Sequence, residues 1–434
     1  MKLLNSSTNQ LVDLNDQKIT IYNCGPTVYN YVHIGNVRPL VVFDVLHRFL
    51  LNQRKEVVYI QNITDVDDKI IKAAAAEGIS EKELTTRYTN AYQDIFQLLN
   101  IRPVIMPHVS EHIEAIKEYI SNLIKIGAAY VVDGDVYFDI SKVPNYGHVS
   151  HQDPNKLLEG VRKENKTNKK NHLDFVLWKQ TTEGISWESP WSQGRPGWHT
   201  ECCVLINKYA GDHVTIHGGG VDLKFPHHEN ENAQNFALYG RDIADIWMHV
   251  GHINVEGAKM SKSLNNFILV KDLVNANNAN GLRWFFYKAK YEQPVNFSKQ
   301  LLDEATKEVN SVVRAIAVAR TYNIANDVFF KEAAQVADEF ASALSDDLNL
   351  PNAITYLLSQ VSKLNTIIRE KKYIEANSLC CVIAKELDVL GIKYELQDHA
   401  ASVKLIKDWK KAVDEKNYEQ ADQLRKQLVE KGLL

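Results

Sequence analysis

The chain has 434 residues, a length that corresponds to roughly two to four domains. Its 45% hydrophobic and 24% charged residues are typical of a globular protein, and a formal net charge of -4 argues against indiscriminate coating of nucleic acid. The sequence shows no apolar signal-peptide core and no membrane-length apolar run. Five cysteines at 24, 202, 203, 380 and 381 form no evenly spaced framework, so we expect a reducing, cytoplasmic setting.

The first predicted unit is a strand, a loop and a helix. A short apolar segment at 19–22 is followed by CGPTVYNYVHIGN at 24–36, and apolar residues at helical spacing predict a helix over 37–51. Gly35 lets backbone approach a ligand closely, and the helix N-terminus that follows favours a phosphate. The pattern alone is common, so its function depends on partners further along the chain.

The next segments alternate between strands and helices. The pattern predicts the following elements: a strand at 57–63, helices within 70–100 and at 110–126, a hairpin at 131–140, a strand at 213–220 that runs into glycines, a helix in the later part of 222–240, a strand at 244–255 and a loop at 257–266. The lysine-rich stretch at 145–171 favours a solvated linker over an RNA contact. Two glycine-bearing strand–helix turns predict a split, doubly wound α/β domain that carries an insertion.

Beyond residue 297 the sequence becomes almost entirely helical. Helices are expected at 299–320, 327–344, 350–369 and 403–416, with a further helical stretch around Cys380 and Cys381 and a charged tail. Their Ile, Leu and Val stripes are typical of the core of an antiparallel helix bundle.

Four side chains form a plausible metal set: Cys24, Cys202, His227 and Glu231. His227 and Glu231 are four residues apart and project from the same face of a helix. Two sulfurs, one nitrogen and one carboxylate suit a tetrahedral zinc ion. The competing ligands Cys203, His228 and Glu229 are not eliminated by spacing, and the simpler interpretation is a polar helix start with buried cysteines.

Six motifs occur in this order: CGPTVYNYVHIGN, NITDVDDKI, DFVLWK, GRPGWHTEC, HGGGVDLKFPHHENE and KMSKSLNN. The chain resembles the cysteinyl-tRNA synthetases, a class I aminoacyl-tRNA synthetase family, from near residue 1 to about residue 430. The resemblance implies a Rossmann-like doubly wound parallel catalytic domain with an insertion, followed by an α-helical bundle. It assigns the zinc ligands to Cys24, Cys202, His227 and Glu231, and supporting roles to Cys203, His228 and Glu229.

The resemblance also implies the remaining site residues. The expected roles are ATP phosphate contacts by His33 and Asn36, stabilisation of pyrophosphate charge by Lys262 with help from Lys259, nucleotide contacts by Gly35, Gly219, Gly220 and Asp222, and a cysteine pocket formed by Gly25, Thr64, Trp198 and His199. Asn36 stands where many class I enzymes have a second histidine, so its share of charge stabilisation is expected to be smaller. The acidic NITDVDDK stretch is interpreted as a solvated helix start that includes Asp67 and Asp68, with Mg2+ expected on ATP rather than in a protein cage.

The implied domain boundaries are 1–110 for the first half of the catalytic domain, 111–200 for the insertion, 201–250 for the second half, 251–297 for the KMSKS loop and stem-contact region, 298–395 for a tRNA-binding bundle and 396–434 for a helical tail with a reduced anticodon-binding region. The expected partners are L-cysteine, ATP and tRNA(Cys). The protein is expected to be a monomer and not to associate with a membrane. Two alternatives stay open: a cysteine ligase with a small amine acceptor, and a non-catalytic zinc-containing RNA-binding paralogue. The main expected departure from the family pattern is at the C-terminus. Members of full length usually continue into a small α/β piece that reads the anticodon, and since this sequence ends at Leu434 that piece is expected to be missing or much reduced, which leaves the mode of anticodon recognition open.

Overall fold

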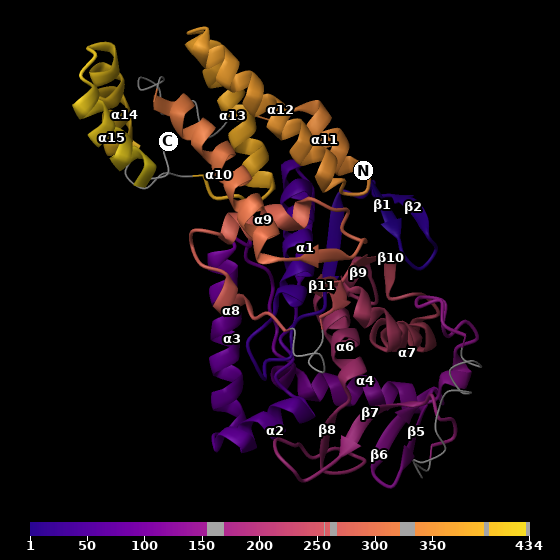
Figure 1. Cartoon of the computed structure of the whole chain (residues 1–434). Coiled ribbons are helices and arrows are strands. Elements are labelled where there is room, and N and C mark those ends of the chain that lie inside the picture. The colour runs from indigo at the N-terminus through magenta and orange to yellow at the C-terminus, as the bar shows by residue number, and fades with distance from the viewer. Residues whose placement is uncertain (154–168, 256, 261–266, 322–334, 395–398, 431–434) are drawn as a thin grey trace.

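A parallel four-stranded sheet forms the centre of the α/β region in the computed structural model, which describes residues 1–153, 169–255, 257–260, 267–321, 335–394 and 399–430 (Figure 1). The strand order is β10 (Ala244–Val250), β9 (Val214–Gly220), β3 (Lys18–Asn23) and β4 (Glu56–Ile60), and every neighbouring pair is parallel. β3 and β9 are adjacent although almost 200 residues separate them, since Tyr22 is paired with His217. This is the switch point of a doubly wound sheet, where ligands bind beyond the carboxyl ends of the strands.

Helix α1 (Ile34–Asn52) is the buried helix of this sheet. Its apolar residues are almost completely buried, and it packs against β4, β9 and β10 of the sheet and against the helical region (Figure 1). The sequence predicted this helix to begin at residue 37, and the structure starts it at Ile34, directly after the capping residue His33. The HIGN sequence therefore forms the first turn of the helix rather than a loop that precedes it.

The expected insertion is present between β4 and β9. After α2 (Asp68–Glu77) and α3 (Glu81–Leu98), the chain forms α4 (Ile113–Lys125) and an antiparallel sheet of order β5-β6-β7-β8. The predicted hairpin at 131–140 is confirmed as β5 (Ala129–Val132) and β6 (Asp135–Phe138). β7 (Phe175–Gln180) and β8 (Gly194–Pro196) follow, and α6 (Trp198–Ala210) leads back to the central sheet. Most of the lysine-rich stretch, 154–168, lies outside the described residues.

One expectation is wrong: the single strand at 244–255 is two strands in different sheets. β10 ends at Val250, and β11 (Ile253–Val255) pairs with β12 (Ala258–Lys259) and β13 (Val295–Phe297). The buried Arg38 on α1 donates from Nη1 to the carbonyl oxygens of Gly251 and Gln293, both at 2.7 Å. This long-range contact holds the bend at Gly251, and nothing in the local apolar pattern predicts it.

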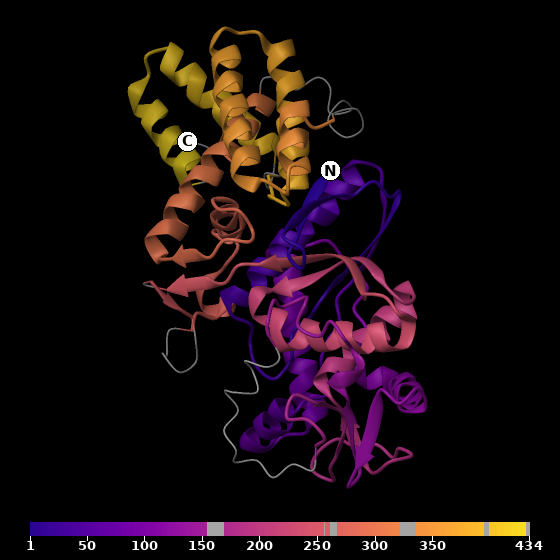
Figure 2. The same cartoon turned by 90° about the vertical axis from the view of Figure 1, so that its right-hand side faces the viewer.

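The helical region stands at one end of the α/β domain (Figure 2). Its elements are α9 (Ala279–Tyr287), α10 (Lys299–Thr321), α11 (Asp338–Ser345), α12 (Leu350–Arg369), α13 (Tyr373–Val389), α14 (His399–Asp414) and α15 (Tyr418–Glu430). The first part of the predicted 327–344 helix lies outside the described residues. Among the described helices, none is both long and apolar enough to cross a membrane.

The smaller elements complete the chain. They are β1 (Lys2–Asn5) and β2 (Gln10–Asp13) of the N-terminal hairpin, the short helical turns η1 (Val109–His112), η2 (Ile140–Lys142), η3 (Val221–Leu223) and η4 (Lys224–His228), helix α7 (Glu229–Tyr239) and helix α8 (Val270–Leu273). α7 carries the end of the HHENE motif beside β9, and α8 follows the KMSKS segment.

A buried ionic cluster joins α1 to the helical region. Arg283 on α9 donates to Asp44 of α1 at 2.6 Å and to the carbonyl oxygen of Leu390 at 3.0 Å, and both charged side chains are about 1% exposed. Arg48 adds a second contact to Asp44 at 2.9 Å. Helix α1 and the helical region are therefore tied by charged groups that are almost completely buried.

We expect Arg283→Met to destabilise the chain by about 3 kcal/mol, because it leaves a buried carboxylate and two carbonyl groups with fewer donors. Urea unfolding followed by circular dichroism measures the change. Lys411→Met is the matched control: its ion pair with Glu415 is exposed, so no measurable change is expected. Equal unfolding midpoints for Arg283→Met and the unmodified chain would contradict this account of the joint.

Candidate active site

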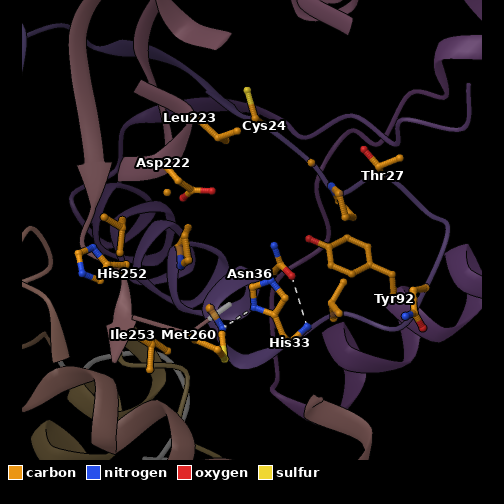
Figure 3. A pocket seen from close by; sticks show the side chains of 18 of the residues that line it. Cys24, Thr27, His33, Asn36, Tyr92, Asp222, Leu223, His252, Ile253 and Met260 are labelled. Atoms are coloured by element: carbon orange, nitrogen blue, oxygen red, sulfur yellow. Dashed lines mark hydrogen bonds between the residues drawn. The ribbon is translucent and has the colours of Figure 1, made fainter. Parts of the chain in front are cut away.

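A cavity of about 350 Å³ lies beyond the carboxyl ends of β3, β4 and β9. Figure 3 shows Cys24 and Asp222 toward one end and His33, Asn36 and Met260 toward the other. Its lining also includes Gly25, Tyr29, Gly35, Lys69, Trp198 and Gly220. Cys24, one member of the candidate metal set, and the HIGN turn therefore face one space at the switch point of the sheet.

The four predicted metal ligands converge. The Sγ atoms of Cys24 and Cys202 are 3.7 Å apart, Cys202 Sγ is 3.6 Å from His227 Nε2, and Cys24 Sγ is 3.7 Å from Glu231 Oε1. A tetrahedral zinc ion with bonds of about 2.3 Å to sulfur and about 2.0–2.1 Å to nitrogen or oxygen requires separations of roughly 3.5–3.8 Å for pairs that include a sulfur, and of roughly 3.3–3.4 Å between nitrogen and oxygen. These three separations fit a zinc ion, while His227 Nε2 and Glu231 Oε1 are at hydrogen-bond distance, 2.7 Å.

The electrostatics of this set differ between its members. Burial, followed by the contact with Cys202, raises the pKa of the Cys24 thiol well above its usual range. The charged forms of the other three residues are favoured. Burial raises the pKa of the Cys202 thiol, but the neighbouring Cys24 and His227 bring it down to about 7. Burial lowers the pKa of His227, but the Glu231 carboxylate raises it to about 10. Burial would raise the pKa of Glu231, yet the two histidines beside it hold it well below the usual range. A buried, water-excluded group of thiol, imidazole and carboxylate of this kind is suited to a divalent cation.

The structure adds a residue that the sequence interpretation missed. His217 on β9 donates from Nε2 to Glu231 Oε2 at 2.5 Å and is fully buried. His217 and His228 also form a second possible ligand set with Cys24 and Glu231, and Cys24 Sγ is 3.4 Å from His228 Nε2. The signal in the sequence was a histidine in the middle of an apolar strand, since a buried polar residue needs a partner.

We expect His217→Phe to weaken zinc binding by about 10–100-fold, because the carboxylate of Glu231 loses the group that orients it. Competition with a fluorescent chelator on the full chain measures the zinc affinity. His47→Phe is the control, since His47 is also a buried histidine but lies on α1 within the core. If His217→Phe had unchanged zinc affinity, the hydrogen bond from His217 to the Glu231 carboxylate would not contribute to zinc binding.

The HIGN turn caps its own helix. His33 Nδ1 accepts from the backbone N–H of Gly35 at 3.1 Å, and Asn36 Oδ1 accepts from the N–H of His33 at 3.3 Å. Asn36 therefore uses its amide as the reciprocal member of a capping box, a role for which it needs no positive charge. A side-chain carbon on Gly35 would lie 2.9 Å from the His33 ring and 3.0 Å from Met260 Cε, so a larger residue here would force the capping histidine to shift.

The predicted nucleotide residues lie along the end of β9. Gly220 and Asp222 line the cavity, and a side chain on Gly220 would overlap the Asp222 carboxylate. Gly219 is one residue further inside, on the strand. Lys259 is placed by its backbone on β12, where it pairs with Asn254, and Lys262 lies outside the described residues. The roles of both lysines stay predictions.

The predicted cysteine-pocket residues divide into two groups. Gly25 and Trp198 line the cavity, and Gly25 donates its N–H to Asn62 Oδ1 at 2.9 Å. Thr64 and His199 lie behind the wall. The Thr64 hydroxyl donates to Glu201 Oε2 at 2.9 Å, and His199 Nδ1 is 3.0 Å from His227 Nδ1.

The acidic motif is more than a solvated helix start. Asp67 caps α2 by accepting from the N–H of Lys69 at 2.7 Å, as a helix start predicts. Asp68, in contrast, is 2.6 Å from Lys179 Nζ and also pairs with Arg195, so it connects α2 to the sheet of the insertion. The motif thus fixes the side of the cavity nearest the insertion.

Comparison with known proteins identifies the family. Residues 10–307 match the family model described as the tRNA synthetases class I (C) catalytic domain. The cysteine–tRNA ligase of Ureaplasma parvum is 46% identical over 439 aligned residues, which cover 100% of both chains. The chain belongs to the cysteine–tRNA ligase family. The Malacoplasma penetrans cysteine–tRNA ligase is 43% identical and covers 99% of this chain and 98% of its own.

Solved structures support the fold of this family member. Mycobacterium tuberculosis methionyl-tRNA synthetase in complex with methionyl-adenylate aligns with a TM-score of 0.61 at 14% identity, covering 89% of this chain and 90% of the other. The ternary LeuRS–tRNA–LeuAMS complex from Agrobacterium radiobacter aligns with a TM-score of 0.63 at 10% identity, covering 86% and 84%. The class I catalytic domain followed by a helical region, expected from the sequence, is confirmed.

Proposed function

We propose that this class I enzyme activates L-cysteine with ATP, forms cysteinyl-adenylate and pyrophosphate, and transfers the cysteinyl group to tRNA(Cys). One observation carries the proposal: Cys24, the first member of the thiol–imidazole–carboxylate set, lines the same cavity as the HIGN turn. A substrate cysteine whose side chain is near Cys24 and a nucleotide bound at the HIGN turn would lie next to each other. The names of the relatives, cysteine–tRNA ligases over the whole chain, support tRNA as the acceptor.

Cys24, Cys202, His227 and Glu231 are the proposed holders of one zinc ion per chain. When bound, zinc supplies a soft Lewis acid that binds a thiolate much better than a hydroxyl. Cysteine and serine differ by a single atom, and a pocket of hydrogen bonds separates them poorly. A direct bond from the metal to the substrate sulfur can favour cysteine over serine by about 10⁴-fold or more. Without discrimination of that size, an enzyme usually needs a second site that hydrolyses the wrong product.

The other residues bind and orient the nucleotide. The backbone N–H groups at the start of α1, together with His33 and Asn36, are placed to hold ATP phosphates, since a helix N-terminus favours anions. Gly220 and Asp222 offer a close backbone approach and a carboxylate to the adenosine. Lys262, assisted by Lys259, is proposed to stabilise the pyrophosphate charge, with Mg2+ arriving on the phosphates of ATP.

No protein nucleophile is required for either step. The substrate carboxylate attacks the α-phosphate, pyrophosphate leaves, and a ribose hydroxyl of the tRNA then attacks the activated carbonyl, so AMP leaves. The chain contributes position and fixed charge, which together account for large accelerations in reactions of this type. We infer that a single chain suffices, because every proposed side chain comes from this one polypeptide.

Two measurements on the full chain test the proposal. Cysteine-dependent exchange of pyrophosphate into ATP tests activation, and charging of tRNA(Cys) against a tRNA with an altered anticodon tests transfer. We expect both activities, with the altered tRNA charged less well. Pyrophosphate exchange without tRNA charging would indicate a ligase that uses a small amine as its acceptor. The absence of exchange would indicate a non-catalytic RNA-binding paralogue.

A further inference from the structure

A cationic and aromatic platform lies at the mouth of the cavity, formed by Lys69, Tyr29 and Trp198. Lys69 Nζ is 5.8 Å from the centroid of the Tyr29 ring and 5.9 Å from that of Trp198. All three residues line the cavity, and they come from three separate segments: the loop after β3, the first turn of α2 and the start of α6. Neither the sequence motifs nor the proposed activation step assigns Lys69 or Tyr29 a role.

The charge of Lys69 is not used within the described part of the chain. No carboxylate of a described residue lies within ion-pair distance of its Nζ, whereas the neighbouring Asp68 is engaged by Lys179 and Arg195. The Lys69 side chain is exposed, and its own backbone N–H is held by the Asp67 cap. Because the backbone of Lys69 is held in the helix cap while its ammonium group is exposed, the ammonium group is suited to bind an anionic group of a ligand that arrives from solvent.

Trp198 provides a flat surface beside this charge. Its ring is stacked on His227, with centroids 4.2 Å apart and planes inclined by 21°, so one face is covered by a predicted metal ligand. The residue is nevertheless 37% exposed, which is unusual for a tryptophan at the entrance of a buried polar site. Because His227 and the interior stacking hold the indole in place, the exposed part forms a rigid platform at low entropic cost.

We propose that Lys69, Tyr29 and Trp198 receive the 3′-terminal adenosine of the tRNA acceptor end, with the base on the aromatic rings and its phosphate near Lys69. This inference rests on the proposed function, in which a terminal ribose must reach the activated carboxyl group. Single-stranded nucleic acid is commonly held by aromatic platforms flanked by positive charge. Trp198, stacked on the proposed zinc ligand His227, places the platform next to the proposed cysteine-binding end, where the adenylate carbonyl is expected.

The alternative occupant is the carboxylate of free cysteine. That carboxylate must attack the α-phosphate, and an ion pair with Lys69 would hold it at the mouth and reduce its nucleophilicity. The terminal adenosine, in contrast, carries both a base for the rings and a phosphate for the cation. The two occupants make opposite predictions for the activation and the transfer step.

Lys69→Met, Lys69→Arg and the control Lys72→Met separate these steps in the full chain. Lys72 is an exposed lysine one turn further along α2. We expect cysteine-dependent exchange to stay within about two-fold in all three variants. Single-turnover transfer from preformed adenylate should fall by about 10-fold or more in Lys69→Met, remain near normal in Lys69→Arg and be unaffected in Lys72→Met.

Binding of tRNA without its terminal adenosine provides a second readout. The unmodified chain should bind intact tRNA about 10-fold tighter than the shortened tRNA, and Lys69→Met should lose most of that preference. Equal losses of exchange and transfer in Lys69→Met, or a preserved preference for intact tRNA, would overturn the assignment. Normal exchange with slowed transfer supports it, while a lack of exchange in the unmodified chain would refute the proposed function itself.

Discussion

Replacement of Cys24 by serine is expected to remove zinc and cysteine activation together. The thiol of Cys24 is 3.7 Å from both the Cys202 sulfur and a Glu231 oxygen, so it is a corner of the candidate tetrahedron. A serine hydroxyl is a harder and weaker ligand, and the substrate sulfur would lose the ion that selects it. We expect the zinc content to fall from one per chain to near zero and kcat/KM for cysteine in ATP–pyrophosphate exchange to fall by on the order of 10³-fold or more.

Cys203→Ser is the matched control for this experiment. Cys203 is adjacent in sequence to Cys202 and equally buried, but its sulfur faces the backbone carbonyl oxygens of His199 and Glu231 at 3.6 and 3.5 Å. This variant should retain zinc and most of its exchange activity. If Cys203→Ser lost zinc and Cys24→Ser retained it, Cys203 rather than Cys24 would be the zinc ligand.

Replacement of Lys262 by alanine is expected to slow adenylate formation by about 10²–10³-fold while the affinity for cysteine changes little. The lysine is proposed to contact charge that develops on the pyrophosphate, an interaction that is strongest in the transition state. Met260, in the same motif, lies beside the HIGN turn, since a side-chain carbon on Gly35 would be 3.0 Å from its Cε. Rapid-quench measurement of adenylate formation at several cysteine concentrations separates the two quantities.

Lys271→Ala serves as the control, because Lys271 is an exposed lysine shortly after the motif whose nearest described partners are Asp272 and the Tyr31 ring. Its adenylation rate should remain within a few-fold of normal. If Lys262→Ala weakened cysteine binding as much as it slowed adenylation, Lys262 would contribute uniform binding rather than transition-state stabilisation.

The sequence predicted the main elements of the catalytic region because their signals are local. Apolar residues at helical spacing placed α1, and an Asp-Gly turn between extended arms placed the β5–β6 hairpin. The bend between β10 and β11 was missed because it depends on Arg38, more than 200 residues away. A long-range hydrogen bond of this kind does not change the pattern of apolar residues in the segment that it bends.

The same distinction applies to the site. The ordered motifs placed Cys24 and the HIGN turn correctly beside one cavity, as a split α/β domain requires. His217 was overlooked although it opens the HGGG motif, because its side chain meets Glu231, at 2.5 Å, only once β9 and α7 are folded together. Thr64 and His199 belong to the expected pocket by resemblance; in the structure they contact Glu201 and His227 and are not among the residues that line the cavity. Spacing along the chain does not distinguish a side chain that lines a cavity from one that supports it.

The central claim is that a metal ion held by Cys24, Cys202, His227 and Glu231 recognises the sulfur of the substrate. Substitution of the bound ion by Co2+ makes thiolate ligation visible, because each sulfur ligand adds ligand-to-metal charge-transfer absorption. The account predicts that L-cysteine increases this absorption on the cobalt-containing full chain and that L-serine, at the same concentration, leaves it unchanged. An identical spectrum with and without saturating L-cysteine would contradict the claim.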